Sequence, residues 1–80
     1  MPVVFRDNGI RFFFFSNEGN PREPEHIHVR SPGREAKFWL YPQVELSYNQ
    51  GFSSRDITRF VDLIRARRHI IREVWYDYFG

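Results

Sequence analysis

The chain has 80 residues, which is enough for one domain with one modest hydrophobic core, and we expect a single domain over residues 1–80. Aromatic residues make up 19% of the chain, and this composition argues against disorder because few aromatic side chains fill a small core. The absence of cysteine excludes disulfides and thiolate metal sites. The longest apolar run, Phe12–Phe15, is far too short to cross a membrane, and no signal peptide is recognisable, so we expect a cytoplasmic protein.

Arginine carries almost all of the positive charge. The net charge is only +2, but the isoelectric point is about 9.4, and 11 of the 12 cationic residues are arginine. A guanidinium group binds phosphate or carboxylate through two parallel hydrogen bonds, so the composition is compatible with a nucleic acid partner. A solvated surface that happens to use arginine is the alternative, and charge alone favours it.

An Asn8-Gly9 dipeptide predicts the first hairpin, between strands Val3–Arg6 and Ile10–Ser16. Asn-Gly between apolar runs is typical of a type I′ turn, which requires positive φ at both positions. The predicted cross-strand pairs are Phe5 with Phe12 and Val3 with Phe14. The four consecutive phenylalanines place aromatic rings on both faces of the second strand, which is typical of a central strand or of one covered by a second subunit.

Pro32-Gly33 predicts the turn of a second hairpin, between strands His26–Ser31 and Arg34–Tyr41. Because side chains alternate between the faces of a strand, one face of this hairpin is apolar and is expected to face the core. The other face is expected to be exposed and carries His26, His28, Arg30, Lys37, Trp39 and Tyr41. The simplest register pairs Arg30 with Glu35, His28 with Lys37 and His26 with Trp39.

One long amphipathic helix is predicted from about Ser54 to Tyr76, after a short edge strand over Val44–Tyr48. Ser53 and Asp56 resemble a capping box at the start of this helix. Such a helix is about 35 Å long, whereas a strand of five or six residues spans about 17–20 Å. One end of the helix should therefore overhang the sheet.

A second apolar strip on this helix predicts a partner interface. The strip consists of Leu63, Ile70 and Val74 and makes the apolar arc wider than one face of a sheet needs. We therefore expect a homo-oligomer or a small protein partner that covers the strip. A helix embedded more deeply in its own sheet is the alternative.

His26 and His28 form the most informative motif. Imidazoles at positions i and i+2 of a strand point the same way, about 6–7 Å apart. They suit acid–base catalysis on a phosphodiester, in which Lys37 or Arg30 stabilises the developing charge. They also suit an RNA-binding surface, in which Trp39 and Tyr41 stack on bases while Arg30 and Lys37 hold phosphates. Whether the protein is an enzyme stays open.

Metal binding and a purely structural role are the other interpretations of the two histidines. A metal site would need Glu23, Glu25 or His69 as a further ligand, and a His-x-His motif has no metal-specific spacing, so metal ranks last and we assign no metal ligands and no cofactor. A metal-dependent enzyme stays open as a third possibility. In the purely structural interpretation the histidines are ordinary exposed strand residues packed beside Trp39.

Together these elements predict an α+β fold: an antiparallel sheet of three to five strands with one long C-terminal helix on one face. Five segments also carry a family resemblance: Gly9-Ile10-Arg11, Pro24–Val29, Ala36-Lys37-Phe38, Gly51-Phe52-Ser53 and Trp75–Phe79. They resemble the small prokaryotic domain-of-unknown-function family DUF4160, and the Pro-x-His-x-His-Val block is the most specific part. Members of that family often have a second proline where this chain has Glu25.

The resemblance implies a bacterial stand-alone protein whose gene often lies beside a second small gene, as in toxin–antitoxin pairs. Two functions follow as hypotheses. One is a toxin–antitoxin-like module that engages RNA through the face carrying His26 and His28. The other is a non-enzymatic, antitoxin-like interaction module that forms a homodimer or heteromer through the C-terminal helix.

Overall fold

The computed structural model of the chain describes residues 3–16 and 23–80. The strands are β1 (Val3–Asp7), β2 (Ile10–Phe13), β3 (His26–Ser31), β4 (Arg34–Trp39) and β5 (Glu45–Gln50), and the helices are α1 (Ser54–Ala66) and α2 (Arg68–Phe79). The strands form one antiparallel sheet whose spatial order follows the chain, β1-β2-β3-β4-β5. The predicted α+β class is confirmed, with two helices in place of one.

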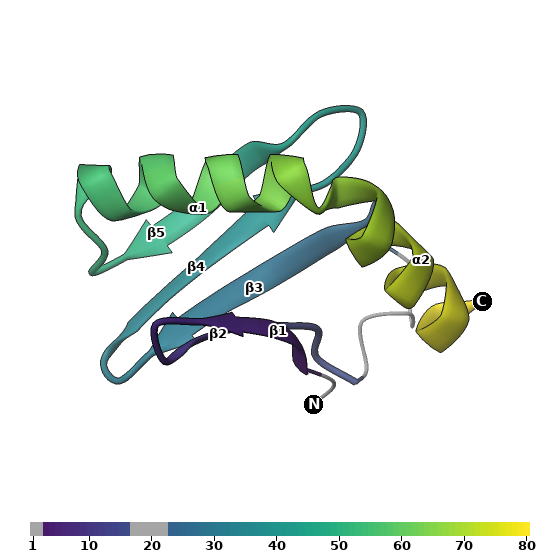
Figure 1. Cartoon of the computed structure of the whole chain (residues 1–80), viewed down its shortest axis with the longest axis horizontal. Helices are drawn as coiled ribbons and strands as arrows, with labels where there is room; N and C mark the ends of the chain where they lie inside the picture. Colours follow the sequence, from purple (N-terminus) through teal and green to yellow (C-terminus); the bar gives the residue numbers. More distant parts are fainter. Residues whose placement is uncertain (1–2, 17–22) are drawn as a thin grey trace.

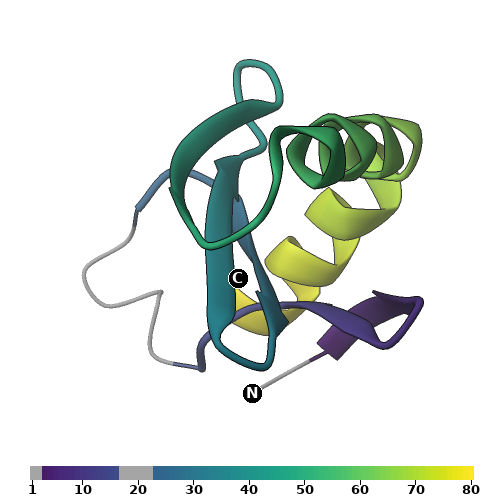
Figure 2. The same cartoon turned by 90° about the vertical axis from the view of Figure 1, so that its left-hand side faces the viewer.

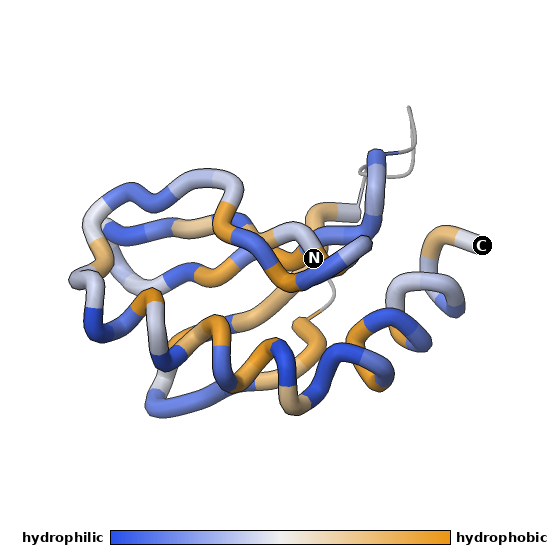
Figure 3. Tube along the Cα trace, turned by 90° about the horizontal axis from the view of Figure 1, so that it is seen from above, coloured by the Kyte–Doolittle hydropathy of each residue, from blue (hydrophilic) through white to orange (hydrophobic). Residues whose placement is uncertain are grey.

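Both helices lie on one side of a curved sheet. Figure 1 shows α1 running along the sheet and α2 turning away at its end. Figure 2 shows how the sheet curls, so that the β1–β2 hairpin closes the fold beneath the helices. The apolar positions of both helices recur turn by turn between polar ones, as Figure 3 shows, and they meet the sheet on its concave side.

The core between sheet and helices is largely aromatic. Phe12 on β2 packs edge-on against Phe60 of α1, with ring centroids 5.6 Å apart. Phe14, just beyond β2, packs edge-on against Trp75 of α2 at 5.1 Å. Offset and edge-to-face ring pairs add to the area that they bury, so these two contacts fix both helices to the same strand.

The predicted register of both hairpins is largely confirmed. Asn8 and Gly9 have φ values of 51° and 77°, as the predicted turn requires. All three predicted pairs of β3 with β4 occur, and Phe5 lies opposite Phe12. Val3 lies opposite Phe13 instead of Phe14, because an irregularity between Val3 and Phe5 shifts the register by one residue.

The predicted single helix is only roughly matched, because the helical segment is divided in two at Arg67, where φ is −111° and ψ is 10°. A straight helix of this length would overhang the sheet. After the break, α2 instead buries Ile71 and Trp75 in the core. The side chain of Arg68 donates hydrogen bonds to the carbonyls of Leu40 and Pro42, which ties the start of α2 to the β4–β5 connection. Neither helix is long and apolar enough to cross a membrane.

The break also redistributes the second apolar strip. Leu63 and Val74 are partly buried and pack against the core, whereas Ile70 is 50% exposed. Most of the wide apolar arc is therefore used within the chain. An interface through Leu63, Ile70 and Val74 stays a prediction.

The N-terminal cap of α1 is a local contact whose contribution can be measured. The Ser53 hydroxyl accepts a hydrogen bond from the backbone N–H of Asp56 at 3.1 Å. Ser53→Ala should lower the free energy of unfolding by about 1 kcal/mol, because an N–H at the helix start loses its acceptor. Urea denaturation measures this change. Ser54→Ala, one position into the helix, is the control and should change stability by less than about 0.5 kcal/mol. An equal loss in both variants would contradict the capping role.

Candidate functional site

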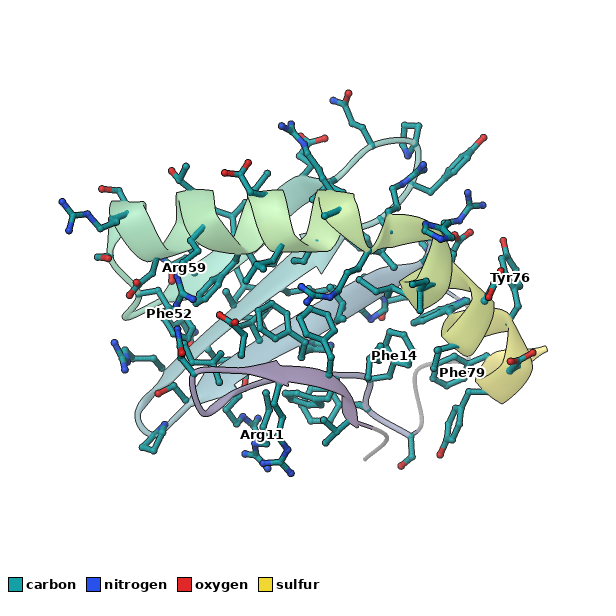
Figure 4. All side chains as sticks on the ribbon, viewed as in Figure 1. Arg11, Phe14, Phe52, Arg59, Tyr76 and Phe79 are labelled. Atoms are coloured by element: carbon teal, nitrogen blue, oxygen red, sulfur yellow. The ribbon has the colours of Figure 1, made fainter. Side chains whose placement is uncertain are left out.

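A line of arginines crosses the outer face of the sheet, by which we mean the face turned away from α1 and α2. Arg6 on β1 lies opposite Arg11 on β2, and Arg11 lies opposite Arg30 on β3. These three residues are called the arginine row below. Their neighbours in sequence, including Phe12 and Val29, belong to the core, so the arginines face the other way. In Figure 4, Arg11 points from the β1–β2 hairpin away from α1.

Aromatic rings and one carboxylate orient two of the three guanidinium groups. The Arg30 guanidinium lies 5.3 Å from the ring centroid of Phe13 and 5.5 Å from that of Phe15. The Arg11 guanidinium lies 5.9 Å from the same Phe13 ring. Arg30 also donates two hydrogen bonds to Oε1 of Glu35, at 3.0 Å from Nε and 2.5 Å from Nη2. Cation–π contacts and a charge-assisted pair hold these side chains in place before any ligand arrives.

Glu35 is the carboxylate that ends the arginine row on β4. Arg30 occupies its Oε1, and the Tyr48 hydroxyl donates to its Oε2 at 2.5 Å. Partial burial alone would raise the pKa of Glu35, but the hydrogen bonds from Tyr48 and Arg30 outweigh that effect and hold the pKa below its ordinary value of 4.5. Glu35 is therefore ionised at neutral pH and both of its oxygens are engaged, which makes it a poor general base.

A cavity of about 550 Å³ lies over this end of the outer face. The arginine row lines it together with Glu35, and residues of the β1–β2 and β3–β4 turns form its rim. Arg34 also lines the cavity, but its guanidinium donates to the Ser31 hydroxyl at 3.1 Å and lies 4.0 Å from a carboxylate oxygen of Asp56. The volume is within the range of ligand pockets, about 300–1,000 Å³.

Like charges on adjacent strands give this cavity an unbalanced positive potential. Residues directly opposite one another on antiparallel strands approach closely, and like charges there are destabilising. Within residues 3–16 and 23–80, no carboxylate pairs with Arg6 or Arg11, and Glu35 pairs only with Arg30 among the three. The arrangement suits an anionic ligand better than it suits the stability of the sheet.

The two histidines lie on the same outer face but inside an aromatic cluster. The His28 ring lies 5.6 Å from Phe13 and 4.5 Å from Phe15. The His26 ring lies 5.0 Å from Trp75, and the two imidazole centroids are 5.3 Å apart. The Nδ1 atom of His26 is 2.8 Å from the carbonyl oxygen of Pro24, so it donates a hydrogen bond there.

The predicted exposure of His26 and His28 is wrong, since they are 1% and 5% exposed. The physical reason is that β2 carries phenylalanines on both faces, so Phe13 and Phe15 cover His28 on the outer face. Trp75 reaches His26 because α2 turns around the end of the sheet. The imidazole ring is amphipathic and packs well in such a setting.

The other predicted site residues are spread along the outer face. Lys37 is held by Glu23, 3.2 Å from its Nζ, and lies 4.4 Å from the ring centroid of Trp39. Trp39 is half-buried, and Tyr41 lies beyond β4 with its ring exposed and the guanidinium of Arg72 at 5.3 Å. Arg30 and Trp39 lie in rows four residues apart along the strands, about 13 Å, so they do not form one compact site.

The residues considered for metal binding do not come together in one site. Glu25 accepts hydrogen bonds from Arg72 and from the Tyr76 hydroxyl, which anchors α2 to the start of β3. His69 is exposed on α2. No group of three His, Asp or Glu side chains in the described part of the chain is placed to hold a metal ion.

Sequence reasoning found Arg30 but missed Arg6 and Arg11. The turn signals predict each hairpin by itself, but they do not predict the pairing of β2 with β3, which brings the three arginines into one row. A usable signal was present. Antiparallel pairing of Phe12 with Val29, two apolar core positions, places Arg11 opposite Arg30.

A family model described as "Domain of unknown function (DUF4160)" matches residues 9–76. The match covers most of the chain, so the chain belongs to the DUF4160 family, as its motifs predicted. Searches of curated proteins and of solved structures found no match.

The lowered pKa of Glu35 predicts a pH dependence of stability. A carboxyl group with a depressed folded-state pKa stabilises the fold above its ordinary pKa, and this contribution is lost as the pH falls through the folded-state value. Glu35→Gln should therefore lose less stability than the wild type between pH 7 and about pH 3. Thermal unfolding across this range measures the difference. Glu73→Gln, at an exposed position of α2, is the charge-matched control and should keep the wild-type pH dependence. Identical pH profiles for wild type and Glu35→Gln would contradict the predicted role.

Proposed function

We propose that the protein binds single-stranded RNA through the arginine row and the outer face that extends from it. The observation that carries the proposal is the direct opposition of Arg6, Arg11 and Arg30 on three adjacent strands beside a cavity. Such repulsion would be relieved when a polyanion neutralises the arginines, and guanidinium groups bind phosphate, as they bind carboxylate, through pairs of hydrogen bonds.

A flexible single strand fits this face better than a duplex. Single strands are bound by a positive groove combined with aromatic side chains on which bases stack. Beyond the arginine row, the outer face carries the half-buried Trp39, and Lys37 lies beside its ring and is paired with Glu23. The aromatic ring would continue the binding surface along β4, and a phosphate there would have to replace Glu23 as the partner of Lys37.

We propose binding without cleavage, in contrast to the catalytic role predicted from the sequence for the two histidines. His26 and His28 would need contact with the ligand to transfer protons, and both rings are buried. Glu35 has both oxygens engaged by Arg30 and Tyr48. The role that we propose within a toxin–antitoxin-like pair is therefore to sequester RNA, and this partnered role rests on the family resemblance alone.

A second candidate function is a non-enzymatic interaction module that binds a second copy or a small protein through α2. The observation that favours it is the exposure of Ile70, Tyr76 and Tyr78 on α2. Sedimentation of the wild type and of Ile70→Asp tests this candidate. A wild-type dimer that dissociates in the variant supports it, and a wild-type monomer at all concentrations contradicts it.

Removal of one arginine from the row should weaken RNA binding while it stabilises the fold. Arg6→Gln removes a repulsive neighbour of Arg11, and it should raise the free energy of unfolding by about 0.2–1 kcal/mol. It should also lower the slope of log affinity against log salt by about 0.7 for a single strand. Fluorescence anisotropy with a labelled oligoribonucleotide measures affinity, and urea denaturation measures stability.

Arg55→Gln is the matched control, because Arg55 is exposed on α1 and lies on the opposite side of the molecule from the outer face. It should leave both quantities close to the wild type. Wild-type affinity in Arg6→Gln, or a larger loss in Arg55→Gln, would contradict binding at the arginine row.

A further inference from the structure

The cavity over the arginine row lies where the outer face ends. Gly9 of the β1–β2 turn and Pro32-Gly33 of the β3–β4 turn line its rim. From the arginine row, the outer face continues only in the direction away from these turns, toward Lys37 and Trp39. We propose that the cavity holds the terminal phosphomonoester of the RNA strand. This inference rests on the proposed function and names the contact that would set the direction in which the strand is bound.

The charge in the cavity matches a phosphomonoester better than an internal phosphodiester. A diester in the chain carries one negative charge and two non-bridging oxygens. A phosphomonoester carries about −1.5 to −2 charges at pH 7 and three acceptor oxygens. The arginine row supplies three guanidinium groups, and Glu35 neutralises only the one on Arg30.

Two of these guanidinium groups lie near one aromatic ring. Arg11 and Arg30 come from different strands, yet both guanidiniums lie over the ring of Phe13, at 5.9 Å and 5.3 Å from its centroid. Arg11 and Arg30 are also directly opposite one another on adjacent strands, so their side chains project from the same face as close neighbours. Donors on two neighbouring side chains can bind several oxygens of one compact group, and a phosphomonoester offers three.

The next nucleotide would lie over Lys37. Lys37 is two residues further along β4 than Glu35 on the same face, about 6.6 Å at 3.3 Å per residue. Its Nζ lies 4.4 Å from the Trp39 ring centroid and 3.2 Å from a carboxylate oxygen of Glu23, so this step offers an aromatic surface and an ammonium group that a phosphate would take over from Glu23. A strand whose terminal phosphate is in the cavity would thus leave along the outer face without crossing either turn.

The test compares RNA strands of one sequence and length that differ only at their ends. One oligoribonucleotide carries a 5′-phosphate, one carries a 3′-phosphate and one has hydroxyl groups at both ends, each with an internal fluorophore. The wild type should bind one of the phosphorylated strands about tenfold more tightly than the hydroxyl strand, because at least one charge-assisted contact is added. Preference for the 5′-phosphate or for the 3′-phosphate supports the inference and fixes the strand polarity.

Variants locate the effect. Arg11→Gln should reduce the preference for the phosphorylated end to within about twofold, because the Arg11 guanidinium is lost and Arg30 already donates from Nε and Nη2 to Glu35. Arg11→Lys keeps the charge but loses the paired donors of the guanidinium. It should therefore bind the hydroxyl strand more tightly than Arg11→Gln does, but its preference for the phosphorylated end should stay reduced. Arg55→Gln should keep the full preference. Circular dichroism checks that each variant is folded, and either Arg11 variant suffices if the other does not fold.

The outcomes separate the inference from the proposed function. Equal affinity of the wild type for all three strands overturns the end-specific site and leaves RNA binding intact. A preference that survives in both Arg11 variants overturns the location of the site. Failure of all three strands to bind overturns the inference and the proposed function together.

Discussion

Aromatic rings project from both faces of β2 and of the residues that follow it, and both the fold and the candidate site depend on these rings. On the concave side, Phe12 packs against Phe60 of α1, and Phe14, just beyond the strand, packs against Trp75 of α2. On the outer side, the Phe13 ring stacks with His28 and supports the guanidiniums of two arginines. A central strand that is apolar on both faces needs cover on both faces, and here helices supply one layer while arginine stems and imidazoles supply the other.

The Phe13 ring also supports part of the arginine row. Phe13 lies on the outer face but is fully buried, and Arg11 and Arg30 lie over its ring. The guanidiniums of Arg11 and Arg30 are therefore oriented in the free protein, which would reduce the entropy cost of binding an anion. Three like charges lie on adjacent strands, and their repulsion in the free protein is what a bound anion would remove. Retained repulsion at a surface cavity is a stronger functional signal than the modest net charge of the whole chain.

The sequence predicted what depends on short-range alternation and missed what depends on the pairing of distant segments. The turn at Asn8-Gly9, the register of β3 with β4 and the cap at Ser53 follow from local patterns, and all three are confirmed. The mismatch in length between helix and sheet was visible in the sequence, but the break at Arg67 was not, because no glycine or proline lies between Ser54 and Phe79 to mark it. The burial of the histidines and the assembly of the arginine row both require the β2–β3 pairing, across residues that carry no hairpin signal.

The arginine row can be observed directly by NMR of the arginine side-chain Nε–H groups during titration with end-phosphorylated RNA. Arg11 and Arg30 lie over one ring at the cavity, whereas Arg55 on α1 is an internal reference in the same sample. If the outer face is the binding surface, the Arg6, Arg11 and Arg30 signals shift in proportion to bound RNA and the Arg55 signal does not. Shifts confined to arginines of α1 and α2, with the arginine row unchanged, would contradict the proposed site.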